Sequence, residues 1–366
     1  MITIQVSVSK GWLHKEGGFS FPEKYYFDPY FRWEQDRKAD RFLNNLFPDL
    51  PIYNMESNLV QAPYFNPHQI LIGGIQPNMI IGMSLGAKLI CPDDRDADID
   101  EKPCETLKSV NELPSPKDIL NREIIKLFDM QIEQIYEDRP DLRPIPPFFW
   151  DSSGRATIHG LLTTAQKLFG EKVFLMMFEN SQEFKKILKW ITDVYILLIE
   201  HYAALADILI TSVHIGECSA AMVSGTQFSD AVLEQTNRLA KVCQAVRMHS
   251  CGFSDHLLES FSKINRLSII DTGSNTSVAK IRRIFGRDFM INIAPPLEIF
   301  NLNTEDNAVE DWLEKTLRDN KEGPLQIEFH IEASYSLEKC LQVFNSIGIS
   351  KNRHNKPFLM TFSSKW

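Results

Sequence analysis

The chain has 366 residues and carries 39 lysines and arginines against 48 aspartates and glutamates, which gives a net charge of −9. Its 43% apolar and 24% charged residues are typical of a globular protein and exclude global disorder. The acidic balance argues against a nucleic-acid partner, because such a partner requires a basic face. We expect no membrane partner either, since no apolar run reaches the roughly 18–20 residues of a spanning helix and no secretion signal is visible.

The cysteines are too few and too irregularly spaced for a disulfide framework in a chain of this size. They are Cys91, Cys104, Cys218, Cys243, Cys251 and Cys340. This pattern predicts a cytoplasmic protein with reduced thiols. At least one of these thiols is then free to act as a metal ligand or a nucleophile.

The N-terminal half of the chain shows three recognisable segments. The spacing of apolar residues predicts a helix from Asp28 to Leu46. Residues 92–119 are polar, acidic and proline-bearing, which is typical of an excursion over the surface. Residues 139–150 contain four prolines, which are excluded from helix interiors, so we expect this segment to be irregular.

The C-terminal half has a regular pattern that predicts the fold. A long helix is expected from Ser181, its predicted N-cap, to about Leu205. After it, amphipathic helical segments alternate with strand-like runs at residues 206–215, 244–250, 266–271, 289–294 and 324–331. Five consecutive strand–helix units predict a parallel sheet covered by helices. No glycine-rich phosphate loop follows a run, so an α/β fold of the (β/α)₈ TIM-barrel type is favoured over a doubly wound open sheet.

Polar and metal-capable residues gather where the predicted strands end. In a (β/α)₈ barrel, functional residues lie at the C-terminal ends of the strands. The residues at these ends are His214, Glu217, Cys218, His249, Cys251, Asp271, Asn292, Glu328 and His330. A barrel with a purely structural role does not need this series, so it indicates a functional site.

The sequence His249-Ser250-Cys251 is the strongest candidate within this series. In an extended segment, residues i and i+2 point to the same side. The imidazole and the thiolate therefore converge, as in tetrahedral zinc sites with mixed nitrogen and sulfur ligands. Gly252 then lets the backbone turn tightly. The alternative is a core histidine beside a buried cysteine.

Most of the chain resembles the uroporphyrinogen decarboxylase superfamily, and more closely its cobamide-dependent methyltransferase branch. The segments that carry the resemblance are IHGLLTTAQKLFG, HIGECSAAMVSGTQFSDAV, RMHSCGFSDHLLE, LSIIDTGSNTSVAKIRRIFG and INIAPPLEIFNLNTEDNAVEDWLEK. The resemblance implies a TIM barrel with extra N-terminal helices and loops. We therefore expect one domain over residues 1–366, in which residues 1–65 form a helical extension packed on the barrel.

The resemblance also implies a chemistry. Methyltransferases of this family bind zinc through H-x-C and a later cysteine, and the metal activates a thiol that takes a methyl group from a methylated corrinoid protein. The implied acceptor is a small-molecule thiol or a similar soft nucleophile. The chain has no D-x-H-x-x-G corrinoid motif, so a corrinoid would arrive on a partner protein or as free cobamide.

The chain departs from the family pattern in two ways. Uroporphyrinogen decarboxylases lack H-x-C at this strand end and carry an arginine-rich N-terminal motif that is absent here, so haem-pathway decarboxylation is not expected. The later cysteine is also missing, since the matching region reads EFHIEASYSLEKC. We predict His330 as the third zinc ligand, with Glu328 and Cys340 as alternatives. Cys340 shares a predicted helix face with apolar residues, which favours core packing.

Three further residues are predicted to serve catalysis. Glu217 takes the place of an acidic residue common in the superfamily, where it would ligate metal, orient substrate or form a structural ion pair. Of Glu217 and its neighbours His214 and Cys218, one or two can face the barrel mouth. Asp271 is a candidate fourth ligand or a partner that fixes the tautomer of His249. Asn292 is a candidate hydrogen-bond partner of substrate.

Other assignments stay open at this point. His159 and the Thr163-Thr164 pair lie near an early strand end and are candidates for lining the pocket. Two other functions compete with methyl transfer. One is a metal-dependent lyase or decarboxylase acting on a small metabolite, and the other is a non-catalytic corrinoid- or metal-binding module.

Overall fold

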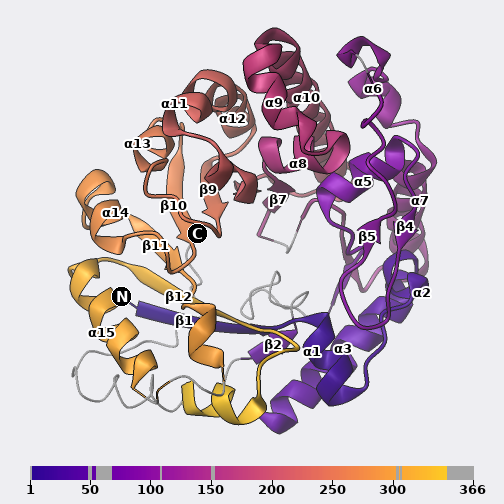
Figure 1. The fold of residues 1–366 in the computed structure, drawn as a ribbon. Helices are drawn as coiled ribbons and strands as arrows, with labels where there is room; N and C mark the ends of the chain where they lie inside the picture. Colours follow the sequence, from indigo (N-terminus) through magenta and orange to yellow (C-terminus); the bar gives the residue numbers. More distant parts are fainter. Residues whose placement is uncertain are drawn as a thin grey trace.

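A computed structural model describes residues 2–47, 52–54, 68–107, 109–149, 153–301, 305 and 307–343. Its centre is an eight-stranded sheet in the order β2-β1-β12-β11-β10-β9-β8-β7, in which every neighbouring pair is parallel. The strands follow an arc around the centre of the molecule, and helices lie outside them (Figure 1). This is the TIM-barrel fold that the strand–helix alternation predicts.

The strands of this sheet come from both ends of the chain. They are β1 (Ile2–Val8), β2 (Ile52–Asn54), β7 (Arg155–His159), β8 (Ser212–Gly216), β9 (Ala245–Ser250), β10 (Leu267–Thr272), β11 (Met290–Ile293) and β12 (Leu325–Ile331). The last five coincide with the five predicted runs. Strand β12 pairs with β1 over seven residues, so the last strand returns to the first, as in a barrel.

The N-terminal segment contributes helices and also part of the sheet. Its helices are α1 (Lys10–Gly17), α2 (Glu23–Phe27) and α3 (Pro29–Leu46). The helix expected at 28–46 is confirmed, with Asp28 as its N-cap accepting hydrogen bonds from the N–H groups of Tyr30 and Phe31, each at 3.0 Å. Strand β1 was not expected, because the sequence analysis assigned residues 1–65 to a helical extension.

The middle of the chain differs from expectation at one segment. Residues 139–150 were expected to be irregular, but Arg143–Ile145 forms β6, which pairs in parallel with β3 (Gln69–Leu71). The acidic segment 92–119 contains short elements: β5 (Asp98–Ile99), paired with β4 (Leu89–Ile90), the 3₁₀ turn η2 (Val110–Glu112) and α6 (Pro116–Ile119).

The remaining helices surround the sheet. They are α5 (Pro77–Ser84), α7 (Glu123–Asp138), α8 (Leu161–Phe169), α9 (Lys172–Glu179), α10 (Ser181–Leu205), α11 (Gly225–Gln227), α12 (Leu233–Leu239), α13 (Leu258–Phe261), α14 (Val278–Phe285) and α15 (Ala308–Asn320). The long helix α10 has the predicted bounds, but its N-cap is Asn180, whose side chain accepts from Glu183 N–H, and not Ser181. The chain is helical at residues 337–343, as expected after β12, and residues 344–366 lie outside the described residues.

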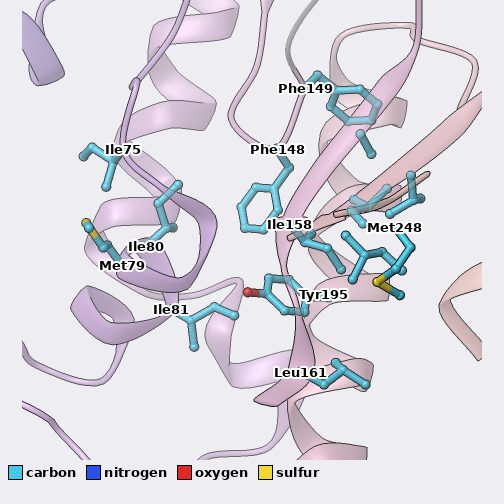
Figure 2. Close-up of a cluster of buried hydrophobic side chains, with 14 of the residues drawn as sticks. Ile75, Met79, Ile80, Ile81, Phe148, Phe149, Ile158, Leu161, Tyr195 and Met248 are labelled. Carbon is cyan, nitrogen blue, oxygen red and sulfur yellow. The ribbon is translucent and has the colours of Figure 1, made fainter. Parts of the chain in front are cut away.

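A continuous hydrophobic core joins the outer helices to the sheet. Figure 2 shows one part of it, where Ile80 and Ile81 of α5 approach Phe148, Ile158 of β7 and Tyr195 of α10. The rings of Phe148 and Tyr195 pack edge to face with their centroids 6.1 Å apart. This packing fixes β7 and the start of α8 beside the barrel centre. Among the described residues, no helix is both long enough and apolar enough to cross a membrane.

Candidate metal centre

The strand register brings the polar strand ends to one level of the barrel. Gly216 of β8 lies opposite His249 of β9, which lies opposite Asp271 of β10, and Asp271 lies opposite Asn292 of β11. A cavity of about 690 Å³ opens at this end of the sheet. Its lining includes His159, His214, Cys218, His249, Cys251 and His330.

Three side chains at the cavity wall form what we call the thiol cluster: Cys218, His249 and Cys251. Their sulfur and nitrogen ligand atoms all lie within 4.8 Å of one another. Cys251 is exposed, whereas Cys218 and His249 are half-buried. A hydrogen bond with Cys218 lowers the pKa of Cys251 to about 7, and the same interaction raises the pKa of Cys218 to about 12. The cluster thus places a readily ionised thiol at the mouth of the cavity.

The turn after β8 places Cys218 in this cluster. The backbone N–H of Glu217 donates to the carbonyl of His249 at 2.8 Å, so the turn continues alongside β9. One residue beyond Cys218, the N–H of Ser219 donates to Oγ1 of Thr163 at 3.1 Å. Hydrogen bonds of the residues before and after Cys218 therefore fix its position.

Glu217 lies behind the cluster and outside the cavity lining. Its carboxylate accepts from the backbone N–H groups of Leu162 at 3.2 Å and Thr163 at 3.0 Å, in the first turn of α8. Its side chain is almost fully buried, and burial raises its pKa to about 7, although the α8 donors favour the charged form. The geometry makes Glu217 a cap of α8 that orients Cys218 through the backbone.

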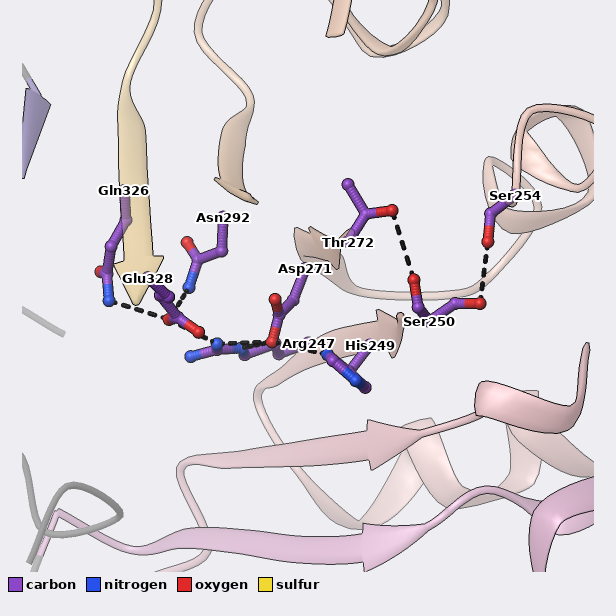
Figure 3. Close-up of polar contacts among 9 residues, drawn as sticks. All are labelled: Arg247, His249, Ser250, Ser254, Asp271, Thr272, Asn292, Gln326 and Glu328. Atoms are coloured by element: carbon purple, nitrogen blue, oxygen red, sulfur yellow. Dashed lines mark hydrogen bonds and ion pairs between the residues drawn. The ribbon is translucent and has the colours of Figure 1, made fainter. Parts of the chain in front are cut away.

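Beside the cluster lies a second group, which we call the carboxylate network: Arg247, Asp271, Asn292, Gln326 and Glu328 (Figure 3). Nη2 of Arg247 donates to Oδ2 of Asp271 at 2.6 Å and to Oε1 of Glu328 at 2.8 Å. The same Oε1 accepts from the side-chain amides of Asn292 at 2.7 Å and Gln326 at 2.9 Å. One guanidinium thus pairs with both carboxylates, and the two amides add hydrogen bonds to Glu328.

Asp271 joins the network to the thiol cluster. Its Oδ2 lies 3.0 Å from Nδ1 of His249. Burial alone would raise the pKa of Asp271, but Arg247 and His249 hold it well below its usual range. Burial opposes the charged form of His249, yet Asp271 outweighs it and raises the pKa of His249 to about 10. Asp271 also belongs to a second metal-capable group with His214 and His249.

The other predicted ligands lie apart from the thiol cluster. His330 lines the cavity and is hydrogen-bonded to Ser7 on the neighbouring strand β1. Glu328 belongs to the carboxylate network. Cys340 is fully buried in the core, which raises its pKa to about 12. In the described part of the chain, the groups with converging ligand atoms include none of these three residues.

Comparison with protein families identifies the fold family. Residues 78–324 match the family model described as uroporphyrinogen decarboxylase (URO-D). The chain belongs to the uroporphyrinogen decarboxylase family. A methyltransferase from Methanosarcina mazei has a similar structure, with 14% sequence identity, a TM-score of 0.61, and 95% of this chain and 94% of that chain covered. This likeness shows a shared fold.

A B12-independent methionine synthase from a Shewanella species, solved in complex with selenomethionine, is also similar. It shares 11% identity and has a TM-score of 0.46, and the match covers 97% of this chain and 98% of that chain. No curated protein matches the chain.

In this member of the uroporphyrinogen decarboxylase family, the sequence analysis named Cys218 but did not predict it as a ligand. Its position two residues after Gly216, the last residue of β8, is the sequence feature that indicates a place near the barrel mouth. What the sequence could not supply is the hydrogen bond from Glu217 N–H to the carbonyl of His249, which turns Cys218 toward β9.

Proposed function

We propose that this protein is a zinc-dependent methyltransferase whose metal is held by Cys218, His249 and Cys251. The observation that carries the proposal is the convergence of two sulfurs and one imidazole nitrogen within 4.8 Å at the wall of a cavity. Zinc accepts this donor set, and catalytic zinc sites have three protein ligands with a fourth position left for substrate. Cys218 takes the role that the sequence analysis gave to His330.

The neighbouring residues suit such a site. Asp271 lies next to Nδ1 of His249, which leaves Nε2 for the metal and fixes the orientation of the ring. Glu217 and Thr163 hold the turn that carries Cys218. When bound, zinc would keep the sulfur of an acceptor thiol deprotonated near neutral pH.

The cavity and its mouth suggest how the two substrates meet. A volume of about 690 Å³ accommodates a small thiol beside the cluster. Cys251 is exposed, so the cluster is open toward solvent on one side. We propose that the methyl donor, a methylated corrinoid on a partner protein or as free cobamide, approaches from this side.

Methyl transfer from methylcobalamin tests the proposal. Zinc-loaded protein should demethylate methylcobalamin in the presence of coenzyme M, homocysteine or cysteine, as followed by the visible spectrum of the cobalamin. The variant Cys251→Ala should lose this activity, whereas Cys340→Ala, a buried cysteine outside the cluster, should keep it. A protein that holds zinc but demethylates with none of these thiols would contradict the proposal.

The second metal-capable group favours an alternative. His214, His249 and Asp271 supply two nitrogens and one oxygen, a donor set that suits a metal polarising a substrate carboxylate or carbonyl. A lyase or decarboxylase acting on a small metabolite would use such a group. Arg247 already pairs with Asp271 at 2.6 Å, and for this reason we place the alternative second.

A further inference from the structure

His159 is a polar residue of the cavity that the proposed zinc site does not use. It ends strand β7 and lines the cavity. Its Nδ1 is buried and has no hydrogen-bond partner within the described part of the chain. Burial lowers the pKa of His159 to about 4, so the ring is neutral at physiological pH and offers one donor and one acceptor. A buried polar atom without a partner is costly, and a ligand can remove that cost.

The register places His159 on the same level as the thiol cluster. His159 lies opposite Gly216 on β8, and Gly216 lies opposite His249 on β9. Since neighbouring strands are about 4.8 Å apart, the backbones of the two histidines are separated by roughly 10 Å. Between them stands a glycine, which contributes no side chain.

The structure has room for a side-chain atom at Gly216. A Cβ atom added there would meet a single heavy atom within 4 Å, the carbonyl oxygen of Ile158 at 3.6 Å, which is an ordinary contact. Gly216 is also part of the cavity lining. The space above Gly216, between the strands that carry the two histidines, therefore belongs to the cavity.

We propose that His159 determines acceptor specificity, by hydrogen-bonding an uncharged polar group, such as a hydroxyl, on a short thiol whose sulfur lies at the thiol cluster. The inference rests on the proposed function, because it takes the cluster as the place where the sulfur binds. The tail of the thiol then crosses above Gly216 toward β7. A neutral imidazole distinguishes such a tail from an alkyl chain of the same length.

Thiol binding to the cobalt-substituted protein tests this inference without an activity assay. Sulfur-to-cobalt charge-transfer absorption reports dissociation constants for two matched pairs of probes: 2-mercaptoethanol against ethanethiol, and 3-mercaptopropanol against propanethiol. In the wild type, at least one hydroxylated probe should bind more tightly than its alkyl partner. His159→Leu should reduce this preference about 5- to 10-fold, the usual worth of a hydrogen bond, and leave alkyl-thiol binding and cobalt content unchanged.

Two further variants separate a specific role from a structural one. His159→Gln keeps hydrogen-bonding capacity and should retain most of the preference. Gly216→Ala adds a methyl group where the fold has room, and should weaken binding of both pairs about 5-fold or more without loss of cobalt. If His159→Leu does not fold, His159→Gln and Gly216→Ala carry the test.

The outcomes distinguish this inference from the proposed function. If the wild type binds no cobalt, or if no thiol changes its sulfur-to-cobalt charge-transfer absorption, the proposed function fails. If the thiols bind but neither pair shows a hydroxyl preference in the wild type, or His159→Leu leaves that preference unchanged, the role of His159 is overturned and the zinc site stands. Unchanged thiol affinities in Gly216→Ala would likewise overturn the proposed path of the tail.

Discussion

The thiol cluster and the carboxylate network are neighbours that share strand β9, and they have opposite character. Along β9 and the residue after it, Arg247, His249 and Cys251 follow at two-residue steps, and they are buried, half-buried and exposed in that order. In the carboxylate network, the guanidinium of Arg247 pairs with two carboxylates at 2.6 and 2.8 Å. In the thiol cluster, two sulfurs and a nitrogen converge at the cavity wall.

In the proposed function, this difference separates the residues that support the site from the residues that bind the metal. A buried charge is tolerated where it is paired and hydrogen-bonded, and the carboxylate network meets this condition within itself. The thiol cluster combines soft donors of the kinds that zinc binds, on the side open to solvent. His249 joins the two groups, because one ring nitrogen faces Asp271. In the proposed function, the network thus orients the ligand, and the cluster holds the metal.

The largest expected effect is the loss of zinc from the thiol cluster. Cys218→Ala removes one of three ligands, so the purified protein should contain less than about a tenth of the wild-type zinc by elemental analysis. Cys340→Ala is the matched control and should retain full occupancy, because Cys340 is buried away from the cluster. Retention of zinc in Cys218→Ala with loss in His330→Ala would restore His330 as the third ligand.

Removing the cation of the carboxylate network should affect stability strongly. Arg247→Met leaves the carboxylates of Asp271 and Glu328 without their shared partner, and breaking such a buried pair costs about 3–5 kcal/mol. The free energy of unfolding in urea measures this. The control Arg287→Met breaks an exposed pair with Glu322 and should cost less than about 1 kcal/mol. An equal loss of unfolding free energy in the two variants would contradict the view that the buried network contributes more stability than an exposed ion pair.

The contact between the two regions should have an intermediate effect. Asp271→Asn removes the carboxylate beside Nδ1 of His249, and loss of such a partner weakens metal affinity about 10- to 100-fold. Competition with a chromophoric chelator gives the affinity. Asp193→Asn, on the outer helix α10, should leave zinc affinity at the wild-type value. An unchanged affinity in Asp271→Asn would show that the network does not orient the ligand.

The smallest expected effect concerns the support of Cys218. Glu217→Gln weakens the cap of α8 and should lower the free energy of unfolding by about 1 kcal/mol. Zinc affinity should fall only a few-fold, since the backbone hydrogen bond from residue 217 to His249 is kept. Thermal unfolding and chelator competition measure the two effects. A complete loss of zinc would instead make Glu217 a ligand, as the sequence analysis allowed.

The fold was predictable where sequence patterns are local. Five apolar runs predicted β8 to β12, and the spacing of apolar residues predicted α3 and α10 to within one residue, although the N-cap of α10 is Asn180 and not Ser181. Strand β1 was missed although Ile2, Ile4, Val6 and Val8 alternate with polar residues, the pattern of a half-buried strand. Its place beside β12 depends on a pairing across more than 300 residues, which no local pattern contains.

The candidate site was likewise predictable only where its residues are close together in the sequence. His249 and Cys251 lie together because strand geometry alone brings residues i and i+2 to one face. The third member depends on tertiary structure. Cys218 reaches the cluster through a turn anchored on α8 and β9, whereas His330 lies on β12, hydrogen-bonded to Ser7 of a strand that the sequence analysis had not placed. Whether Cys218 or His330 binds zinc stays a prediction.

X-ray absorption at the zinc edge tests the central claim most directly. In the zinc-loaded wild type, the account predicts two sulfur neighbours at about 2.3 Å and one imidazole nitrogen at about 2.0 Å, with a third sulfur after addition of a bound thiol. A resting spectrum with one sulfur and two imidazole nitrogens would contradict the assignment of Cys218, and one with no sulfur would contradict the thiol cluster as the metal site.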